Sequence, residues 1–238
     1  MSEPDPTIQA KLRKLEQEIE SQARIQAKLH QLEQEIESQA SRARRGALSA
    51  KGRSIYNPFP IPFYFLVIAW AQQIIDQIVF GGRWNLPIIP RRTVGIPGII
   101  FSAFSHADFG HLIANSIPFV IFSWLILIQS YRNYWITLLV GWLGGGFFCW
   151  LLGPDPVHGL SGVVYTLFGY LLWIGWQEQR IIPLFISVFV FVNYWGLIWG
   201  VLPHNPRVAW WGHLIGFVLG IATAYFLGKN QRKNLLNQ

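Results

Sequence analysis

Apolar residues occur along this chain in six long runs separated by short polar connections. The runs cover residues 59–80, 110–129, 134–152, 160–177, 181–201 and 210–228. Each run is close to the ~20 residues that a helix needs to cross a bilayer. A backbone inside lipid must satisfy its own hydrogen bonds, so each run is predicted to be a helix. Glycine and proline clusters mark the predicted helix ends, at 81–82, 97–98, 153–156 and 203–206.

The first 53 residues have a different, polar pattern that contains an internal repeat. Residues 8–24 recur as residues 25–41 with only three changes. Within each copy the apolar positions follow the 4-3-4 spacing of a heptad seam. The offset of 17 residues turns the two seams in different directions on one continuous helix. We therefore expect an exposed helical arm with short contacts or weak self-association, and the alternative is a dedicated partner-binding module.

These patterns divide the chain into three parts. Residues 1–53 form the predicted arm, which ends in a basic linker rich in glycine, serine and alanine, suited to a place beside anionic headgroups. Residues 54–230 form the predicted six-helix domain, and residues 231–238 a cytoplasmic tail. The fold class predicted is thus an all-α membrane protein, a six-transmembrane-helix bundle with an N-terminal cytoplasmic helical arm.

Composition supports a membrane protein and argues against nucleic acid as a partner. The chain is 52% hydrophobic and 13% charged, with 12 tryptophans and a mean hydropathy of +0.31. Its net charge of +7 is spread between aromatic-rich apolar runs, so no compact basic face for nucleic acid is expected. Cys149 is the only cysteine, which excludes an intrachain disulfide.

The basic residues predict the orientation in the membrane. The linker, Arg132, Arg180 and the basic tail all fall on one side of the six-span plan. Basic loops face the cytoplasm, so both termini are predicted to be cytoplasmic. The brevity of the chain and this plan suggest a bacterial inner membrane, with the site described below opening to the outer side.

Ser161 is the first candidate for chemistry. It lies in Gly159-Leu160-Ser161-Gly162, at the predicted start of the fourth helix. Unpaired backbone N–H groups at a helix start favour negative charge, which suits a nucleophile whose attack creates an oxyanion. Taken alone, the pattern favours helix packing, because glycine and serine line many membrane helix contacts.

The sixth run brings a histidine to the same depth. His213 lies within a series of glycines spaced four residues apart, Gly212, Gly216 and Gly220, which permits close approach of another helix. We expect this approach to bring His213 within reach of Ser161 as a general base. Tyr165, one turn after Ser161, is predicted to stack on the imidazole and hold it, a task that an acid performs in a triad.

The second run begins with a third group of polar residues. His106, His111 and Asn115 are spaced H-x4-H-x3-N, and the last two lie one helical turn apart. Both can donate hydrogen bonds toward one point, as an oxyanion requires. His106 precedes the helix, and we expect it to bond the loop backbone rather than take part in chemistry.

Together these motifs resemble the rhomboid intramembrane proteases, and the resemblance covers most of residues 55–228. It is specific at GLSGVVY (159–165), at H-x4-H-x3-N (106–115) and at G-H-x2-G-x3-G (212–220). It implies a serine–histidine dyad of Ser161 and His213 without an acid, and an oxyanion hole lined by His111 and Asn115. The first loop lacks the Trp-Arg pair of many members and has Pro97-Gly98 about where that pair would fall, so its stability or gating is expected to differ.

The implied activity is an intramembrane serine endopeptidase that forms an acyl-enzyme and needs neither cofactor nor metal. Its implied partners are transmembrane segments of other membrane proteins, with small residues at the cut, and the lipid bilayer. The fifth run, with bulky Phe189, Phe191, Tyr194 and Trp195, is a candidate side gate. We also expect a polar cavity lined by His106, His111, Asn115 and Ser161.

Three other readings remain. A catalytically weak or inert rhomboid-like binder of membrane proteins would share the fold. A metal hydrolase would use His106, His111, His213 and Asp108 as ligands, although the paired helical spacing of H-E-x-x-H is missing from the sequence. A transporter is disfavoured because no inverted repeat occurs.

Overall fold

The chain divides between Asn57 and Pro58 into two compact units. This computed structural model describes residues 20, 22, 24–41, 57–203 and 208–236, with side chains as far as Lys229. In the first unit, residues 24–41 form a helix whose side chains are all exposed. The first repeat copy, apart from its last few residues, and the basic linker lie outside the described residues.

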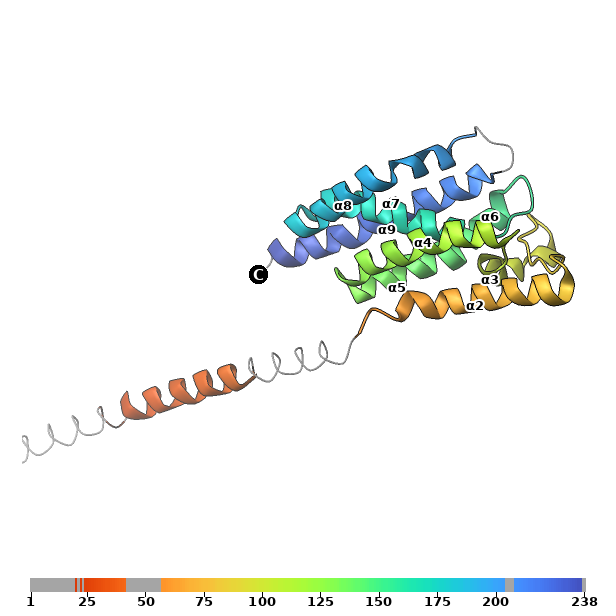
Figure 1. Cartoon of the computed structure of the whole chain (residues 1–238). Coiled ribbons are helices and arrows are strands. Elements are labelled where there is room, and N and C mark those ends of the chain that lie inside the picture. The colour runs from red at the N-terminus through yellow and green to blue at the C-terminus, as the bar shows by residue number, and fades with distance from the viewer. Residues whose placement is uncertain (1–19, 21, 23, 42–56, 204–207, 237–238) are drawn as a thin grey trace, which may run out of the picture. The chain divides into compact units, whose positions relative to one another are not determined.

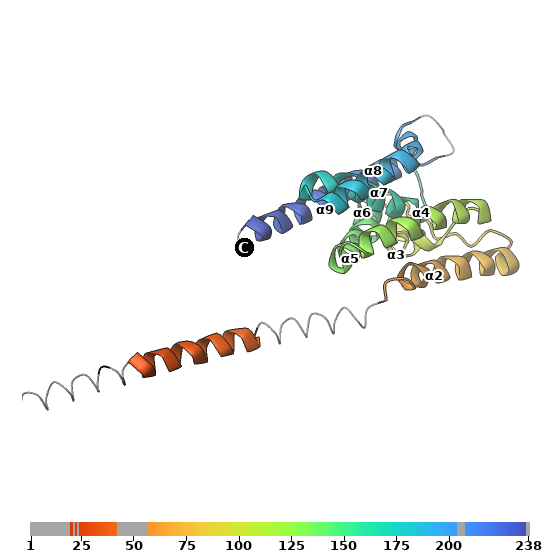
Figure 2. The ribbon, with the colours of Figure 1, turned by 60° about the vertical axis from the view of Figure 1, so that its left-hand side comes forward.

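Five helical segments of the described second unit are long and apolar enough to cross a membrane. They are Ile61–Phe80 (α2 Ile61–Ile75 with η1 Asp76–Phe80), α4 Phe109–Leu127, Tyr131–Leu152 (α5 Tyr131–Leu139, η4 Val140–Gly144 and α6 Gly145–Leu152), Ile181–Val201 (α8 Ile181–Tyr194 with η5 Trp195–Val201) and Trp210–Lys229 in α9. They lie lengthwise side by side, with α2 and α8 at opposite edges (Figures 1 and 2). The α9 helix runs on to Leu236, into the predicted tail.

The remaining long helix, α7 (Ser161–Glu178), has 18 residues and corresponds to the fourth predicted span. It is not among the five segments above, because its sequence is less apolar. Twelve of its residues are buried, and it contacts α4, α5, α6, α8 and α9. Trp173 and Trp176 are exposed, but most of the helix is enclosed by protein. Such a helix needs little lipid-compatible surface, so polar residues are tolerated along it. The count of six spans stays a prediction.

Two glycines bring α9 onto the backbone of α7. A Cβ on Gly216 would overlap the carbonyl of Gly162, and one on Gly220 would overlap the carbonyl of Thr166. Gly212 differs, since its Cβ would meet only Cys149 Sγ of α6, at an ordinary 3.8 Å. The predicted glycine face is therefore used in two parts: Gly216 and Gly220 contact α7, whereas Gly212 faces α6.

The first loop, which joins the first two of the five segments at about residues 81–108, is folded against the third. Its short elements are η2 Thr93–Gly95, α3 Gly98–Phe101 and η3 Ser102–Phe104. The indole N–H groups of Trp142 and Trp150 donate to the loop carbonyls of Ile100 and Arg92, at 2.7 and 2.9 Å. Gly98 packs on the backbone of residues 87–88 with no room for a side chain. These contacts anchor a loop that lacks the Trp-Arg pair.

The start of this loop is held by polar side chains of α2 and η1. Asp76 Oδ1 accepts from the backbone N–H of Trp84 at 2.6 Å, and Gln72 Nε2 donates to the Trp84 carbonyl at 2.9 Å. Both side chains are buried. Polar groups that cost free energy in a membrane helix are thus used to fix the backbone of the loop.

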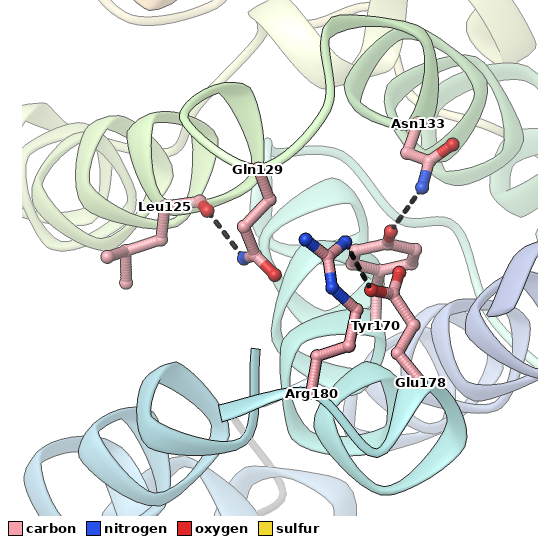
Figure 3. Close-up of polar contacts among 6 residues, drawn as sticks. All are labelled: Leu125, Gln129, Asn133, Tyr170, Glu178 and Arg180. Carbon is pink, nitrogen blue, oxygen red and sulfur yellow. Dashed lines mark hydrogen bonds and ion pairs between the residues drawn. The ribbon is translucent and has the colours of Figure 1, made fainter. Parts of the chain in front are cut away.

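The far end of α7 carries a separate polar cluster (Figure 3). Asn133 of α5 donates to the hydroxyl of Tyr170 at 2.9 Å, and both side chains are buried. At the last residue of the helix, Glu178 pairs with the exposed Arg180 at 3.6 Å. A buried hydrogen bond between α5 and α7 favours one rotation of α7 about its axis, which also sets where Ser161 lies.

Candidate active site

Ser161 and His213 line one cavity near the start of α7. Its wall also includes Ser102, Cys149, His158, Gly159 and Gly212. The cavity has about 40 Å³ of room for water, which is enough for a few molecules and far too little for an extended peptide. The described structure is therefore a closed form of the site.

The composition of this wall corrects part of the sequence prediction. Of the four residues expected to line the cavity, only Ser161 does so. His106 is fully buried and turned toward the backbone, and Asn115 is buried within α4. His106 and Asn115 are thus buried away from the cavity, and the half-exposed His111 does not line it either.

Ser161 is the first residue of α7 and follows Leu160 at the N-cap position. The N-cap has no side-chain hydrogen bond, and the first backbone bond of the helix runs from Val164 N–H to the Leu160 carbonyl. The N–H groups of residues 161–163 are left for another acceptor, at the positive end of the helix dipole. This arrangement suits the stabilisation of negative charge beside Ser161 Oγ.

His213, in the first turn of α9, is held on two sides. Its Nδ1 lies 3.0 Å from the carbonyl oxygen of Gly200, and its ring stacks on Tyr165 with centroids 4.2 Å apart and an interplanar angle of 11°. Because a carbonyl only accepts hydrogen bonds, Nδ1 carries the proton and Nε2 keeps its lone pair. Within the described chain no hydrogen bond joins Ser161 Oγ to His213, and such bonds are often long before substrate binds.

The residues before Ser161 are held by contacts to the first loop. Gly159 N–H donates to the carbonyl of Ser102 at 2.8 Å, and Leu160 N–H donates to His106 Nε2 at 3.2 Å. Val157 pairs with Ile88 through two backbone bonds, which form an isolated bridge. Gly159 has φ +118°, a value that favours glycine. The loop therefore fixes the backbone that leads into the nucleophile.

His111 lies against this same turn. A Cβ on Gly159 would come within 2.9 Å of His111 Cε1 and 3.2 Å of Nε2, so the ring packs on the bare glycine backbone. His111 N–H donates to Asp108 Oδ1 at 2.7 Å, which caps α4 and starts the helix at Phe109. One turn on, the Nδ2 group of Asn115 is buried without a hydrogen-bond partner among the described residues.

Burial controls the charge of the two loop histidines. It lowers the pKa of His106 to about 4, with a further contribution from His111, so this ring is neutral at neutral pH. Its Nδ1 lies 3.3 Å from the Phe104 carbonyl, which leaves Nε2 as the acceptor for Leu160 N–H. Burial and then the proximity of His111 also lower the pKa of His158.

Sequence reasoning missed the groups that orient these side chains. The carbonyls of Leu197 and Gly200 bond Tyr165 Oη and His213 Nδ1, and the Ser102 carbonyl bonds Gly159. A sequence pattern does not indicate which backbone carbonyl accepts a hydrogen bond. The one available signal was the glycine at position 200, where the two rings leave no room for a side chain. The N-cap role of Asp108 was also missed, even though an aspartate three residues before His111 is a helix-start pattern.

The fold and site define a helical membrane protein with a serine at a helix N-terminus and a stacked histidine in one cavity. Residues 95–230 match the Rhomboid domain family. An uncharacterized protein of Mycobacterium bovis is 31% identical over 181 residues, covering 71% of this chain and 75% of its own. One of Mycobacterium leprae is 32% identical over 180 residues, covering 71% of each chain. The chain therefore belongs to the rhomboid family and is an integral membrane protein, which confirms the predicted family and its all-helical class.

Proposed function

We propose that the protein is an intramembrane serine endopeptidase that cleaves transmembrane segments of other membrane proteins. The observation that carries this proposal is the shared cavity of Ser161 and His213. There the imidazole is stacked on Tyr165 and bonded through Nδ1, so Nε2 is left as the base. Membership of the family supports the same activity.

The proposed reaction follows from the tautomer of His213. Nε2 takes the Ser161 hydroxyl proton while Oγ attacks the scissile carbonyl carbon. The tetrahedral intermediate collapses, the C–N bond breaks, and the amine leaves with the proton from His213. Water then attacks the acyl-enzyme with His213 again as base, which releases the acid and restores the serine. Tyr165 holds the ring in place, and neither cofactor nor metal takes part.

The oxyanion is proposed to be stabilised by two sets of donors. The N–H groups at the start of α7 form the first set. The side chains of His111 and Asn115 form the second, and the unpaired Asn115 Nδ2 supports this role because a buried donor without a partner costs free energy. A modest movement of both side chains toward the cavity is required, since neither lines the closed form.

The proposed topology has six spans, both termini cytoplasmic and the site opening to the outer side. At 1.5 Å per residue, the 18 residues of α7 extend about 27 Å, close to the hydrocarbon thickness of a bilayer. The mycobacterial relatives support a bacterial inner membrane. We keep the proposed division into an arm of 1–53, a membrane domain of 54–230 and a tail of 231–238.

Substrate must open the cavity, and α8 is the proposed gate. All buried residues of α8 lie between Pro183 and Val190, whereas none from Phe191 to Val201 is buried. A segment with few buried contacts opens at low free-energy cost. Its outer half is therefore the proposed side entrance for an extended strand of substrate.

The test is cleavage of a model transmembrane substrate by purified protein in liposomes, together with labelling by a fluorophosphonate. Wild type should cleave and label, whereas Ser161→Ala should do neither and His213→Ala should lose nearly all of both. Cleavage that persists in Ser161→Ala would overturn the proposal. Loss of cleavage on chelation of metal ions would support a metal hydrolase instead. A folded wild type that neither labels nor cleaves would indicate an inert, substrate-binding relative.

A further inference from the structure

One short 3-10 segment, η5, supplies both hydrogen-bond acceptors that hold the proposed catalytic base and its stacking partner. The Gly200 carbonyl accepts from His213 Nδ1 at 3.0 Å, and the Leu197 carbonyl accepts from Tyr165 Oη at 2.9 Å. In a serine–histidine–aspartate triad an acid fixes the tautomer and direction of the imidazole. Here a neutral backbone carbonyl occupies that place, so the backbone of η5 does this work.

Only glycine fits at position 200. A Cβ there would overlap Tyr165 Oη and come within 2.9 Å of Tyr165 Cζ and 3.4 Å of His213 Nδ1. The space that a side chain at position 200 would need is thus occupied by the rings of Tyr165 and His213. Gly196, four residues earlier in the same segment, has open space around its Cβ position.

This segment is weakly attached to the rest of the protein. None of its residues is buried, and Trp195 and Trp199 are each more than half exposed. Beyond Val190 in the chain, the ring of Tyr194 in α8 makes an edge-on contact with Phe122 of α4, which is a further link to the bundle. The two hydrogen bonds to His213 and Tyr165 are therefore a large part of what seats η5.

We propose that Gly200 is a positioning residue for His213, and that seating of η5 couples the outer end of α8 to the readiness of the base. When η5 lies in place, Nδ1 is bonded and Nε2 is available to Ser161. When η5 moves outward, the bond to the Gly200 carbonyl breaks and the imidazole is free to rotate or to change tautomer. This inference rests on the proposed function, which it deepens.

The test compares Gly200→Ala with the matched control Gly196→Ala in the full-length protein in liposomes. Gly200→Ala should slow fluorophosphonate labelling of Ser161 by roughly 10-fold to 100-fold, because the general base is misplaced. Gly196→Ala should label at the wild-type rate. Equal rates for Gly200→Ala and wild type would overturn the proposal.

A second variant separates positioning from simple misfolding. Tyr165→Phe removes the hydroxyl that the new methyl group would overlap and keeps the stacked ring. Gly200→Ala/Tyr165→Phe should therefore label faster than Gly200→Ala alone. A double variant no faster than Gly200→Ala would count against the steric account.

Nitrogen NMR of the His213 ring gives a readout independent of activity. With the signal assigned by its loss in His213→Asn, wild type should show the Nδ1–H tautomer, and Gly200→Ala should show a mixture. A wild-type ring protonated on Nε2 would overturn the proposal. If instead wild type has the Nδ1–H tautomer but fails to label, the proposed function fails and the positioning inference stands.

An independent observation concerns the helix of residues 24–41 in the first unit. Ile25, Leu29, Leu32 and Ile36 form its apolar seam and are each 53–66% exposed. Their 4-3-4 spacing places Leu29 and Ile36 at a positions and Ile25 and Leu32 at d positions of a heptad. An apolar stripe on a water-soluble helix marks a surface for another helix.

The charges beside this seam match a second copy of the same helix. In the heptad assignment Lys28 occupies a g position and Glu33 the e position of the next heptad, which face each other across a parallel two-stranded coil. In a symmetric dimer the contact between Lys28 of one chain and Glu33 of the other forms twice. The same two residue types recur in the first copy of the repeat, as Lys11 and Glu16. From Glu33 to Ser41 all charges are negative, which disfavours an anionic lipid surface as the partner.

We propose that this seam pairs in parallel with a second copy of the chain. Confinement to a membrane raises the local concentration of chains, so two heptads suffice for weak pairing. The 17-residue offset predicts that the other copy, most of which lies outside the described residues, would turn its seam away on a continuous helix, so a straight pair would bury only one seam. The contact is thus short, as the repeat spacing predicts.

Disulfide cross-linking of the full-length protein in liposomes tests the pairing. In a Cys149→Ala background, Leu29→Cys at the seam should form a covalent dimer on oxidation, whereas Gln34→Cys on the opposite face should not. Lys28→Glu should reduce the dimer yield, and Lys28→Glu/Glu33→Lys should restore it. Equal cross-linking at positions 29 and 34, or none at 29, would overturn the proposal. Quenching of a fluorophore at position 29 by spin-labelled lipid would show the bilayer to be the partner.

Discussion

The imidazole of His213 lies nearly parallel to the phenol ring of Tyr165, with ring centroids 4.2 Å apart. The two side chains come from different helices, α9 and α7, and the stack holds the flat face of the base. Because the hydroxyl of Tyr165 bonds the Leu197 carbonyl, the ring that holds His213 is itself fixed. The orientation of the base thus depends on packing rather than on an ion pair.

The first prediction separates the Tyr165 ring from its hydroxyl. Tyr165→Ala should lower the rate of substrate cleavage roughly twofold to tenfold more than Tyr165→Phe, because a stacked aromatic pair contributes about 0.5–1.5 kcal/mol. The measurement is the initial cleavage rate in liposomes at saturating substrate. Equal rates for the two variants would mean that stacking does not position His213.

The second prediction concerns the contact between α7 and α9. Gly220→Ala should destabilise the fold by about 1–3 kcal/mol, because the methyl group would meet the backbone of Thr166 and Tyr170, which cannot rotate away. Thermal unfolding in detergent can be followed by maleimide reaction of the buried Cys149 thiol, the only cysteine. Gly212→Ala is the control and should unfold near the wild-type temperature, because its Cβ has ordinary space. Equal destabilisation by both substitutions would argue against this packing.

The third prediction tests the turn before the nucleophile. Gly159→Ala should destabilise the protein, since φ is +118° and the methyl group would press on the His111 ring. Gly162→Ala, three residues later, has no atom near its Cβ position and should leave the unfolding temperature unchanged. The same maleimide assay measures both. A stable Gly159→Ala protein would contradict the packing of His111 on this turn.

The fourth prediction is a dependence of stability on pH through His106. Its pKa is about 4 in the folded protein and near 6.5 when unfolded, so between these values the unfolded chain binds more protons. The contribution of neutral His106 to stability should be fully present above pH 6.5. The free energy of unfolding should then fall by at most about 3 kcal/mol as the pH drops to 4.

Tryptophan fluorescence during denaturation can measure this dependence between pH 7 and pH 4. The variant His106→Gln retains an acceptor for Leu160 N–H but does not titrate, so its stability should change less over the same range. A steeper loss in the variant than in wild type would contradict the role of the neutral ring as acceptor.

Several features of this protein could be predicted from the sequence because they depend on local pattern. Apolar run length placed the helix ends to within a few residues, except that α9 continues to Leu236. In the bilayer a helix is the state that such a run adopts. The glycines at 216 and 220 predicted close contact with the helix of Ser161, since only glycine allows backbones to approach so closely. The stacking of Tyr165 on His213 followed from the same approach.

Other features depended on contacts between segments that are distant in sequence. The acceptors for His213 and Tyr165 are carbonyls of η5, and the turn before Ser161 is held by Ser102 and His106. Every residue has a carbonyl, so no sequence pattern identifies which one lies beside an imidazole. The expected lining of the cavity was wrong for a related reason, because the depth at which His106 and Asn115 are buried depends on how the first loop packs.

By itself the sequence determined the membrane-spanning helices, the family and the residues that bring Ser161 and His213 to one level. The tertiary structure decided that the first loop is anchored through Trp142 and Trp150, and that a backbone carbonyl at Gly200 occupies the place of an acid. The physical reason is that helix formation in a bilayer is decided within each segment. The direction of a hydrogen bond between segments is decided only when all of them are packed.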